Sequence, residues 1–299
     1  MKKTLFIIIV LISFIGFSQT KTKEIRRTKT FTSLKNYKRL FGNNLSKIDS
    51  LNFIFKENDT LIPLPKNYKR PEGFSVPYKA KDSIFLEFYK EIVYKKHSNT
   101  ITEKSKKLTM KYWKNTIKIY FSKSVDKTVK KELKKFANNL SSEIDSLKIT
   151  FVNKLEKSNY LIYGFNSEST YKFEPRLKGN KNIYYISWDK NQRIYDCKLQ
   201  LNSDLYKNKE ELIFNSKKLF LQSLGHFNFT YMLPRDNFFS SLSSKKKKFN
   251  PLDLELLKYH YSFGICKGAN LETFEKQHEI AKKTFERTGR NIYFLHSNK

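Results

Sequence analysis

Metal-dependent hydrolysis needs side chains that hold zinc, and two histidines four residues apart on a helix place both imidazoles on one face. No two of the five histidines are four residues apart: they are His97, His226, His260, His278 and His296. His278 and Glu279 begin like a zinc motif, but Lys282 occupies the position of the second ligand. We interpret that segment as the solvated face of a terminal helix, and we predict no metal site.

Other common catalytic patterns are missing from the sequence. It holds no GxSxG elbow and neither of the glycine-rich phosphate loops GxxxxGK[ST] and GxGxxG. Cys266 follows His260 by six residues, a spacing that does not establish a nucleophile with its base. Glu210 and Glu211 are adjacent and would point to different faces of a helix. Their negative charges would be stabilised by the helix dipole in its first turn. We therefore predict no catalytic residue and no cofactor.

The stretch "SKKLFLQSLGHFNF", residues 216–229, has the pattern of an amphipathic helix that ends at a glycine. Asn208 is a suitable N-cap, with Glu211 three residues later. The predicted buried face consists of Leu212, Ile213, Leu219, Phe220, Ser223 and Leu224. Gly225 is predicted to end the helix, because glycine adopts the left-handed conformation at low cost.

The elements before this helix follow from hydrophobic periodicity. Alternating residues predict a strand in 115–122, and apolar steps of three and four predict a long helix from 126 to 147. Short β-rich runs follow at 148–152 and 160–165, and a hairpin is predicted from 182 to 201. In its second arm, one face is predicted to carry Tyr195, Cys197, Leu199 and Leu201, and the opposite face Asp196, Lys198 and Gln200.

This order of elements resembles the N-terminal subdomain of metzincin-type zincins. Over residues 110–276 the chain is similar to a group of uncharacterised secreted bacterial zincin-like domains, through "LFLQSLGHFNF", "NFF", "PLDLELLKYHY" and "FGICKG". The resemblance implies an α+β fold: a twisted mixed sheet packed on a long backing helix and a degenerate active-site helix. It also implies that the edge strand before this helix binds a peptide.

In the zincin motif HExxHxxGxxH the helix supplies two histidines and a glutamate, and the glycine turns the chain toward the third histidine. With Gly225 on the motif glycine, the histidine positions fall on Lys218, Gln222 and Asn228, and the glutamate position falls on Leu219. An ammonium group repels a cation, an amide is a poor zinc ligand, and leucine cannot take a proton from water. The aligned positions therefore predict a zincin-like domain without metal or hydrolysis.

The N-terminus is typical of an export signal. Lys2 and Lys3 precede an apolar run from Leu5 to Phe17, which is shorter than the ~20 residues that a membrane span needs. Gly16 and Ser18 predict cleavage after Ser18, and an uncleaved anchor is the alternative. No second apolar run follows, so we expect no integral membrane span after cleavage. We expect a periplasmic or extracellular protein.

The composition is strongly basic and contains two cysteines. A net charge of +31 favours polyanionic partners, but the lysines are spread along the chain, and only residues 245–248 form a dense run. An AT-rich genome would also produce many lysines, and export argues against nucleic acid. Cys197 and Cys266 could form a disulfide or remain as two buried thiols.

Three regions are predicted: a signal peptide (1–18), a basic, irregular region with short helices (19–109) and the zincin-like domain (110–299). Residues 61–78 hold four of the seven prolines and predict a long irregular loop. We expect an exported, non-catalytic domain that binds a peptide, a cell-envelope protein or a polyanionic surface polymer. Its predicted edge strand offers Tyr195, Lys198 and Gln200 as contacts. The alternatives are a secreted hydrolase with an unrecognised site and a binder driven by charge alone.

Overall fold

The computed structural model describes residues 30–43, 45, 53–56, 59–65, 67–69, 73–95, 108–165, 174–177, 181–242, 247–289 and 291–297. The predicted signal peptide, His97 and half of the dense lysine run lie outside these residues. The chain forms two compact units, Met1–Pro71 and Glu72–Lys299.

The first unit contains a short helix and a small antiparallel sheet. The sheet has the strand order β1-β3-β2, from β1 (Phe31–Ser33), β2 (Ile54–Lys56) and β3 (Asp59–Pro63). Ser33 caps helix α2 (Leu34–Phe41) by accepting a hydrogen bond from the Asn36 amide. The prediction of an irregular loop over 61–78 is wrong, because β3 and β4 (Gly73–Pro77) both extend into it. Pro63 and Pro77 are the last residues of these strands.

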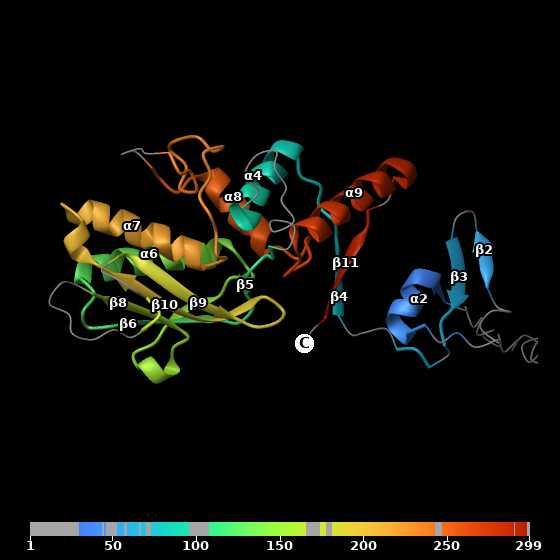
Figure 1. Ribbon diagram of the computed structural model, residues 1–299, viewed down its shortest axis with the longest axis horizontal. Helices are drawn as coiled ribbons and strands as arrows, with labels where there is room; N and C mark the ends of the chain where they lie inside the picture. The colour runs from blue at the N-terminus through green and yellow to red at the C-terminus, as the bar shows by residue number, and fades with distance from the viewer. Residues whose placement is uncertain are drawn as a thin grey trace, which may run out of the picture. The chain divides into compact units, whose positions relative to one another are not determined.

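The second unit is built on a six-stranded, mainly parallel sheet (Figure 1). Its strands are β5 (Tyr112–Trp113), β6 (Ile117–Phe121), β7 (Ile149–Phe151), β8 (Tyr160–Gly164), β9 (Ile183–Trp188) and β10 (Arg193–Leu201). Four parallel pairings give the order β5-β10-β8-β6-β7. β9 is antiparallel and pairs with the other edge of β10. The predicted combination of helices with a sheet is therefore confirmed at this coarse level.

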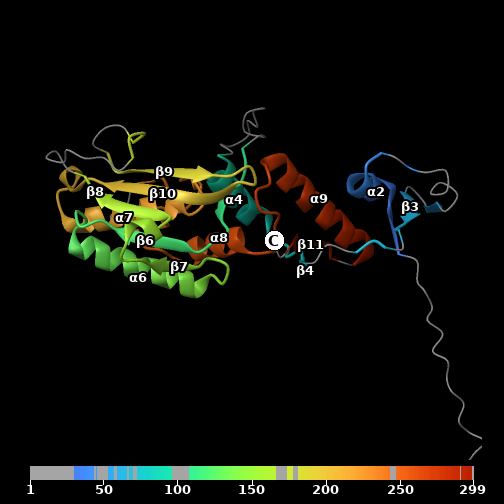
Figure 2. The ribbon, with the colours of Figure 1, turned by 90° about the horizontal axis from the view of Figure 1, so that it is seen from below.

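Helices α6 (Lys127–Glu143) and α7 (Lys209–Ser223) cover one face of this sheet (Figures 1 and 2). Asp126 caps α6 through the amides of Thr128 and Val129, at 2.8 and 3.1 Å. Its apolar stripe, Val129, Leu133, Phe136, Ala137 and Leu140, is buried as predicted. The connection from β6 through α6 to the parallel strand β7 places this stripe against the sheet.

Three further helices complete the unit: α4 (Ser83–Tyr94), α8 (Pro251–Tyr261) and α9 (Leu271–Thr288). Each begins at an Asp or Asn cap, namely Asp82, Asn250 and Asn270. Aromatic rings join them, since Tyr89 of α4 contacts both Tyr259 of α8 and Phe274 of α9. Strand β11 (Tyr293–Ser297) pairs with β4 in a separate antiparallel ribbon.

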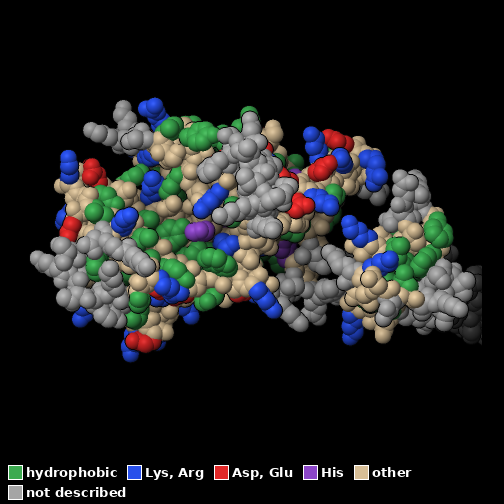
Figure 3. Space-filling view, in the orientation of Figure 1, with side chains coloured by type: hydrophobic (Ala, Val, Ile, Leu, Met, Phe, Trp, Pro, Cys, Tyr) green, Lys and Arg blue, Asp and Glu red, His purple; other side chains and the backbone are tan. Residues whose placement is uncertain are grey.

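Lysine and arginine side chains are scattered over the face seen in Figure 3 rather than gathered in one patch, and acidic side chains lie among them. This distribution agrees with the spread of lysines along the sequence. None of the helices formed by the described residues is both long and apolar enough to cross a membrane.

Asp253 provides a test of how α8 is held. Its buried carboxylate accepts hydrogen bonds from the amides of Asn250, Phe238 and Phe239, at 3.1, 2.9 and 3.2 Å. Asp253→Ala leaves these groups without an acceptor, so we expect the free energy of unfolding to fall by about 2–4 kcal/mol in urea titrations. Asp236→Ala, at an exposed aspartate in the preceding loop, should change it by less than about 0.5 kcal/mol. Equal losses from the two variants would contradict this role.

Candidate functional site

The positions that align with zinc ligands lie on α7 and in the turn that follows it. α7 begins at Asn208, whose side chain accepts a hydrogen bond from the Glu211 amide, as predicted. Leu219, at the position of the general base, is partly buried and packs against the main core. Its side chain therefore contributes to packing.

Lys218 is held against an aromatic ring. Its Nζ lies 4.0 Å from the centroid of Phe229, within the range of a cation–π contact. Burial lowers the pKa of Lys218. Burial, followed by the charge of Lys218, lowers the pKa of Lys247. The position that aligns with the first zinc ligand therefore carries a lysine with a second lysine nearby.

Gln222 and Asn228 are each used to hold the turn in place. The side chain of Gln222 donates to the Phe227 carbonyl at 3.3 Å, and the backbone carbonyl of Gln222 accepts from the Phe227 amide at 3.0 Å. Asn228 donates from its backbone and side-chain nitrogens to the carbonyl of Ile92 in α4, at 2.8 and 3.1 Å. The three aligned positions therefore have separate structural partners. In the described part of the chain no three His, Cys, Asp or Glu side chains gather into a possible metal site.

The role predicted for Gly225 needs correction. Gly225 does not have a positive φ; the left-handed residue is His226, with φ of 57°. Glycine is required for another reason, since a Cβ at this position would lie 2.3 Å from Cζ of Phe227. The motif glycine therefore gives space to a ring, and the next residue makes the turn.

The conformation of His226 directs its side chain toward β9. Nδ1 of His226 and the Tyr184 hydroxyl share a hydrogen bond at 3.0 Å, and its ring stacks on Trp188 with 6.2 Å between centroids. Nζ of Lys111 lies 4.9 Å from the centroid of the same Trp188 ring. Burial, followed by the charges of Lys95 and Lys111, lowers the pKa of His226 to about 4. We call these five residues the basic–aromatic cluster.

The predicted edge strand is not at the edge. β10 pairs with β8 through Cys197–Leu201 and with β9 through Ile194–Gln200, so both of its edges are occupied. β9 is the outer strand instead, and no described strand pairs with its other edge. Strand order depends on pairing between distant segments, which alternation within one hairpin does not reveal.

The three predicted contact residues on β10 are accordingly not brought together at a free edge. Tyr195 falls in a β-bulge between Ile194 and Asp196 and is 57% exposed, whereas Cys197 on its predicted face is buried. The extra residue breaks the alternation, which is why these two side chains differ. Gln200 is fully buried, and its amide binds the Tyr163 hydroxyl and the Lys181 carbonyl.

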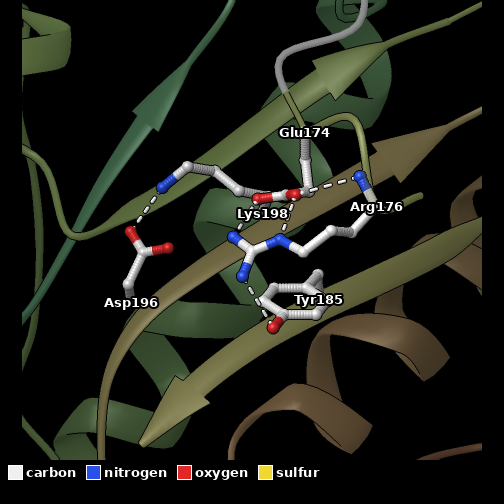
Figure 4. A network of polar contacts seen from close by, with 5 residues as sticks. All are labelled: Glu174, Arg176, Tyr185, Asp196 and Lys198. Carbon is white, nitrogen blue, oxygen red and sulfur yellow. Dashed lines mark hydrogen bonds and ion pairs between the residues drawn. The ribbon is translucent and has the colours of Figure 1, made fainter.

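Lys198 belongs to a polar network on the sheet face opposite α7 (Figure 4). It forms an ion pair with Asp196. Beside it, the Arg176 guanidinium donates to Glu174 and to the Tyr185 hydroxyl, both at 2.7 Å, and lies 3.8 Å from the centroid of the Tyr185 ring. The charges of this network are thus matched within the domain.

Both cysteines are free. Cys197 is fully buried beneath α7, and burial raises its pKa far above the usual range. Burial also raises the pKa of Cys266. The thiolate is the nucleophilic form, so these surroundings do not favour cysteine catalysis. Of the two alternatives left by the sequence, the structure has thiols rather than a disulfide.

Sequence reasoning missed Tyr184, Trp188, Lys95 and Lys111 as possible site residues. They come from three separate segments, and their sequence positions carry no shared spacing. No family model matches the chain, and the search of curated proteins likewise found no match.

Gly225→Ala should destabilise the domain by about 1–3 kcal/mol, because the new methyl group overlaps the Phe227 ring. Urea titrations would measure the loss, which should shrink in a Phe227→Leu background. Gly264→Ala is a matched control, since its Cβ would meet nothing closer than 3.7 Å. The overlap would be disproved if Gly225→Ala were as harmless as Gly264→Ala.

Two histidines should make the domain sensitive to acid. Burial is the main cause that lowers the pKa of both His226 and His278 to about 4, below the usual histidine value of about 6.5. The unfolded chain therefore binds more protons between these pH values, so stability is full above pH 6.5 and is lost as pH falls toward 4. We expect the protonation of each histidine to lower the free energy of unfolding by on the order of 2 kcal/mol between pH 7 and pH 4.5. Urea titrations at the two pH values would measure this loss.

A His226→Asn variant tests this assignment, since asparagine tolerates the left-handed conformation that His226 adopts. It should lose less stability over this pH interval than the unmodified protein. An unchanged loss would show that His226 does not contribute.

Proposed function

We propose that this chain is an exported, non-catalytic zincin-like domain that binds an extended peptide by strand addition along β9. The partner would be a peptide or an exposed segment of a cell-envelope protein. The signal-like N-terminus supports export to the periplasm or the exterior. The zincin resemblance is supported by the backing helix α6, the outer strand β9 and the helix α7 that ends at a glycine.

The outer edge of β9, with which no described strand pairs, is the single observation that carries this proposal. The Cys197 amide donates to the Asn159 carbonyl at 3.0 Å, so the backbone of Cys197 faces β8. Backbone groups alternate along a strand, so Lys198 faces β9 and its partner Tyr185 faces β10. The amide and carbonyl groups of Tyr184 and Ile186 must then point outward, where a peptide strand can pair with them.

The contacts around α7 favour binding over hydrolysis. Lys218 contacts Phe229, Gln222 closes the turn and Leu219 joins the core, so none of them offers a metal ligand or a base. A binding role needs only the sheet edge and the side chains next to it.

Two substitutions at Tyr184 separate backbone pairing from side-chain contacts. Tyr184→Ala and Tyr184→Pro both remove the phenol, but only proline removes the outward N–H, and proline is tolerated at a strand edge. Peptides selected by residues 19–299 from a phage-displayed random library should bind Tyr184→Pro about tenfold more weakly than Tyr184→Ala in fluorescence polarisation, roughly the worth of one hydrogen bond.

Thermal melting of both variants would establish that they are folded. Equal affinities of the two folded variants would contradict strand addition. Stoichiometric zinc with chelator-sensitive peptide cleavage would instead support the hydrolase.

A further inference from the structure

We infer that the peptide bound along β9 is acidic, and that its carboxylates are recognised by the basic–aromatic cluster of Lys95, Lys111, Tyr184, Trp188 and His226. This inference rests on the proposed strand addition and adds the chemistry of the partner.

The cluster lies beside the free edge. Tyr184 and Trp188 are four residues apart on β9, so their side chains share one face of the sheet. His226 contacts both of them, which places the imidazole on this face. A peptide strand paired with β9 would direct every second side chain to the same face, next to this cluster.

The two lysines of the cluster have no acidic partner among the described residues. Nζ of Lys111 donates to the Thr109 hydroxyl and, at 3.1 Å, to the Thr109 carbonyl, which are neutral groups. No ion pair joins Lys95 or Lys111 to a carboxylate in the part of the chain that the structure describes. Lys111 and His226 both contact the Trp188 ring, and the charges of Lys95 and Lys111 follow burial among the causes that lower the pKa of His226.

Some lysines of the same domain are matched: Lys198 pairs with Asp196, Lys217 with Glu132 and Lys258 with Glu143. Unpaired lysines occur elsewhere among the described residues, so charge alone does not distinguish the cluster. Its distinguishing feature is a lysine without a carboxylate partner beside the exposed ring of Trp188. A partner that places carboxylates there would meet complementary charge in a half-buried setting, where screening by salt is weaker.

The aromatic rings add contact area for the peptide. Trp188 is 43% exposed although its ring contacts both Lys111 and His226. Exposed tryptophan next to basic side chains is typical of residues that dominate binding energy at interfaces. The combination fits an extended segment with Glu at alternate positions, so that its carboxylates share the cluster face.

Synthetic peptides test this directly. A labelled Thr-Glu repeat peptide is extended and places all its glutamates on one face, and a Thr-Gln repeat is its neutral match. At physiological salt we expect residues 19–299 to bind the Thr-Glu peptide about tenfold more tightly than the Thr-Gln peptide in fluorescence polarisation, equal to about 1.4 kcal/mol. Lys111→Gln should reduce affinity for the Thr-Glu peptide about fivefold and leave the Thr-Gln peptide unchanged.

Lys118→Gln is the matched control, because Lys118 is an exposed lysine on β6 of the same sheet and lies outside the cluster. It should affect neither peptide. If Lys118→Gln weakened the Thr-Glu peptide as much as Lys111→Gln, binding would depend on overall charge and the inference would be overturned. Equal binding of the acidic and neutral peptides by the unmodified protein would also overturn it.

The two proposals fail in different ways. If both peptides bind Tyr184→Pro more weakly than Tyr184→Ala while Lys111→Gln changes neither, strand addition holds and acidic recognition fails. If the Thr-Glu peptide binds the two Tyr184 variants equally, strand addition itself fails. A Thr-Glu peptide with N-methyl groups on one edge gives an independent measurement, since it cannot pair through that edge and should lose binding.

Discussion

The turn after α7 depends on the absence of a side chain at Gly225, because the Phe227 ring occupies that space. Within five residues of the end of the helix, the chain must bury Phe227, reverse direction and reach α4. His226 adopts a left-handed conformation to achieve this, and its ring is thereby set against Tyr184. The place of His226 in the basic–aromatic cluster thus depends on how one ring packs on one glycine.

The end of α7 is fixed to the sheet and to α8 by buried polar groups. The last carbonyls of a helix have no partner within the helix and need donors from elsewhere. Trp113 donates its indole N–H to the Ser223 carbonyl at 3.2 Å, and the Tyr261 hydroxyl donates to the Leu224 carbonyl at 2.5 Å. Tyr160 of β8 shares a hydrogen bond of 2.6 Å with the Ser223 hydroxyl. These contacts align the helix with the strands, so the turn begins from a defined point.

Elements with a strong local signal could be predicted from the sequence, whereas their pairing could not. The apolar stripe of α6 and the cap at Asn208 each depend on residues within one short segment of the sequence, and both predictions are confirmed. The bulge at Tyr195 and the outer position of β9 depend on which strands meet, and that information is spread over residues 160–200. The sequence predicts the left-handed conformation at Gly225, because glycine adopts it most readily. The structure has it at His226, and the Phe227 ring is what requires a glycine at position 225.

The residues at the positions that align with zinc ligands stabilise the domain through other contacts. Lys218 gains a cation–π contact, Gln222 closes the turn, and Asn228 satisfies a carbonyl in the last turn of α4. Histidines at these positions would each have to replace a contact that now supports the fold before they could form a ligand set. The outer edge of β9 has no comparable structural role among the described strands, because no described strand pairs with the outward backbone groups of Tyr184 and Ile186. Structural roles are therefore concentrated on α7 and its turn, whereas the outer edge of β9 keeps backbone groups with which no described strand pairs.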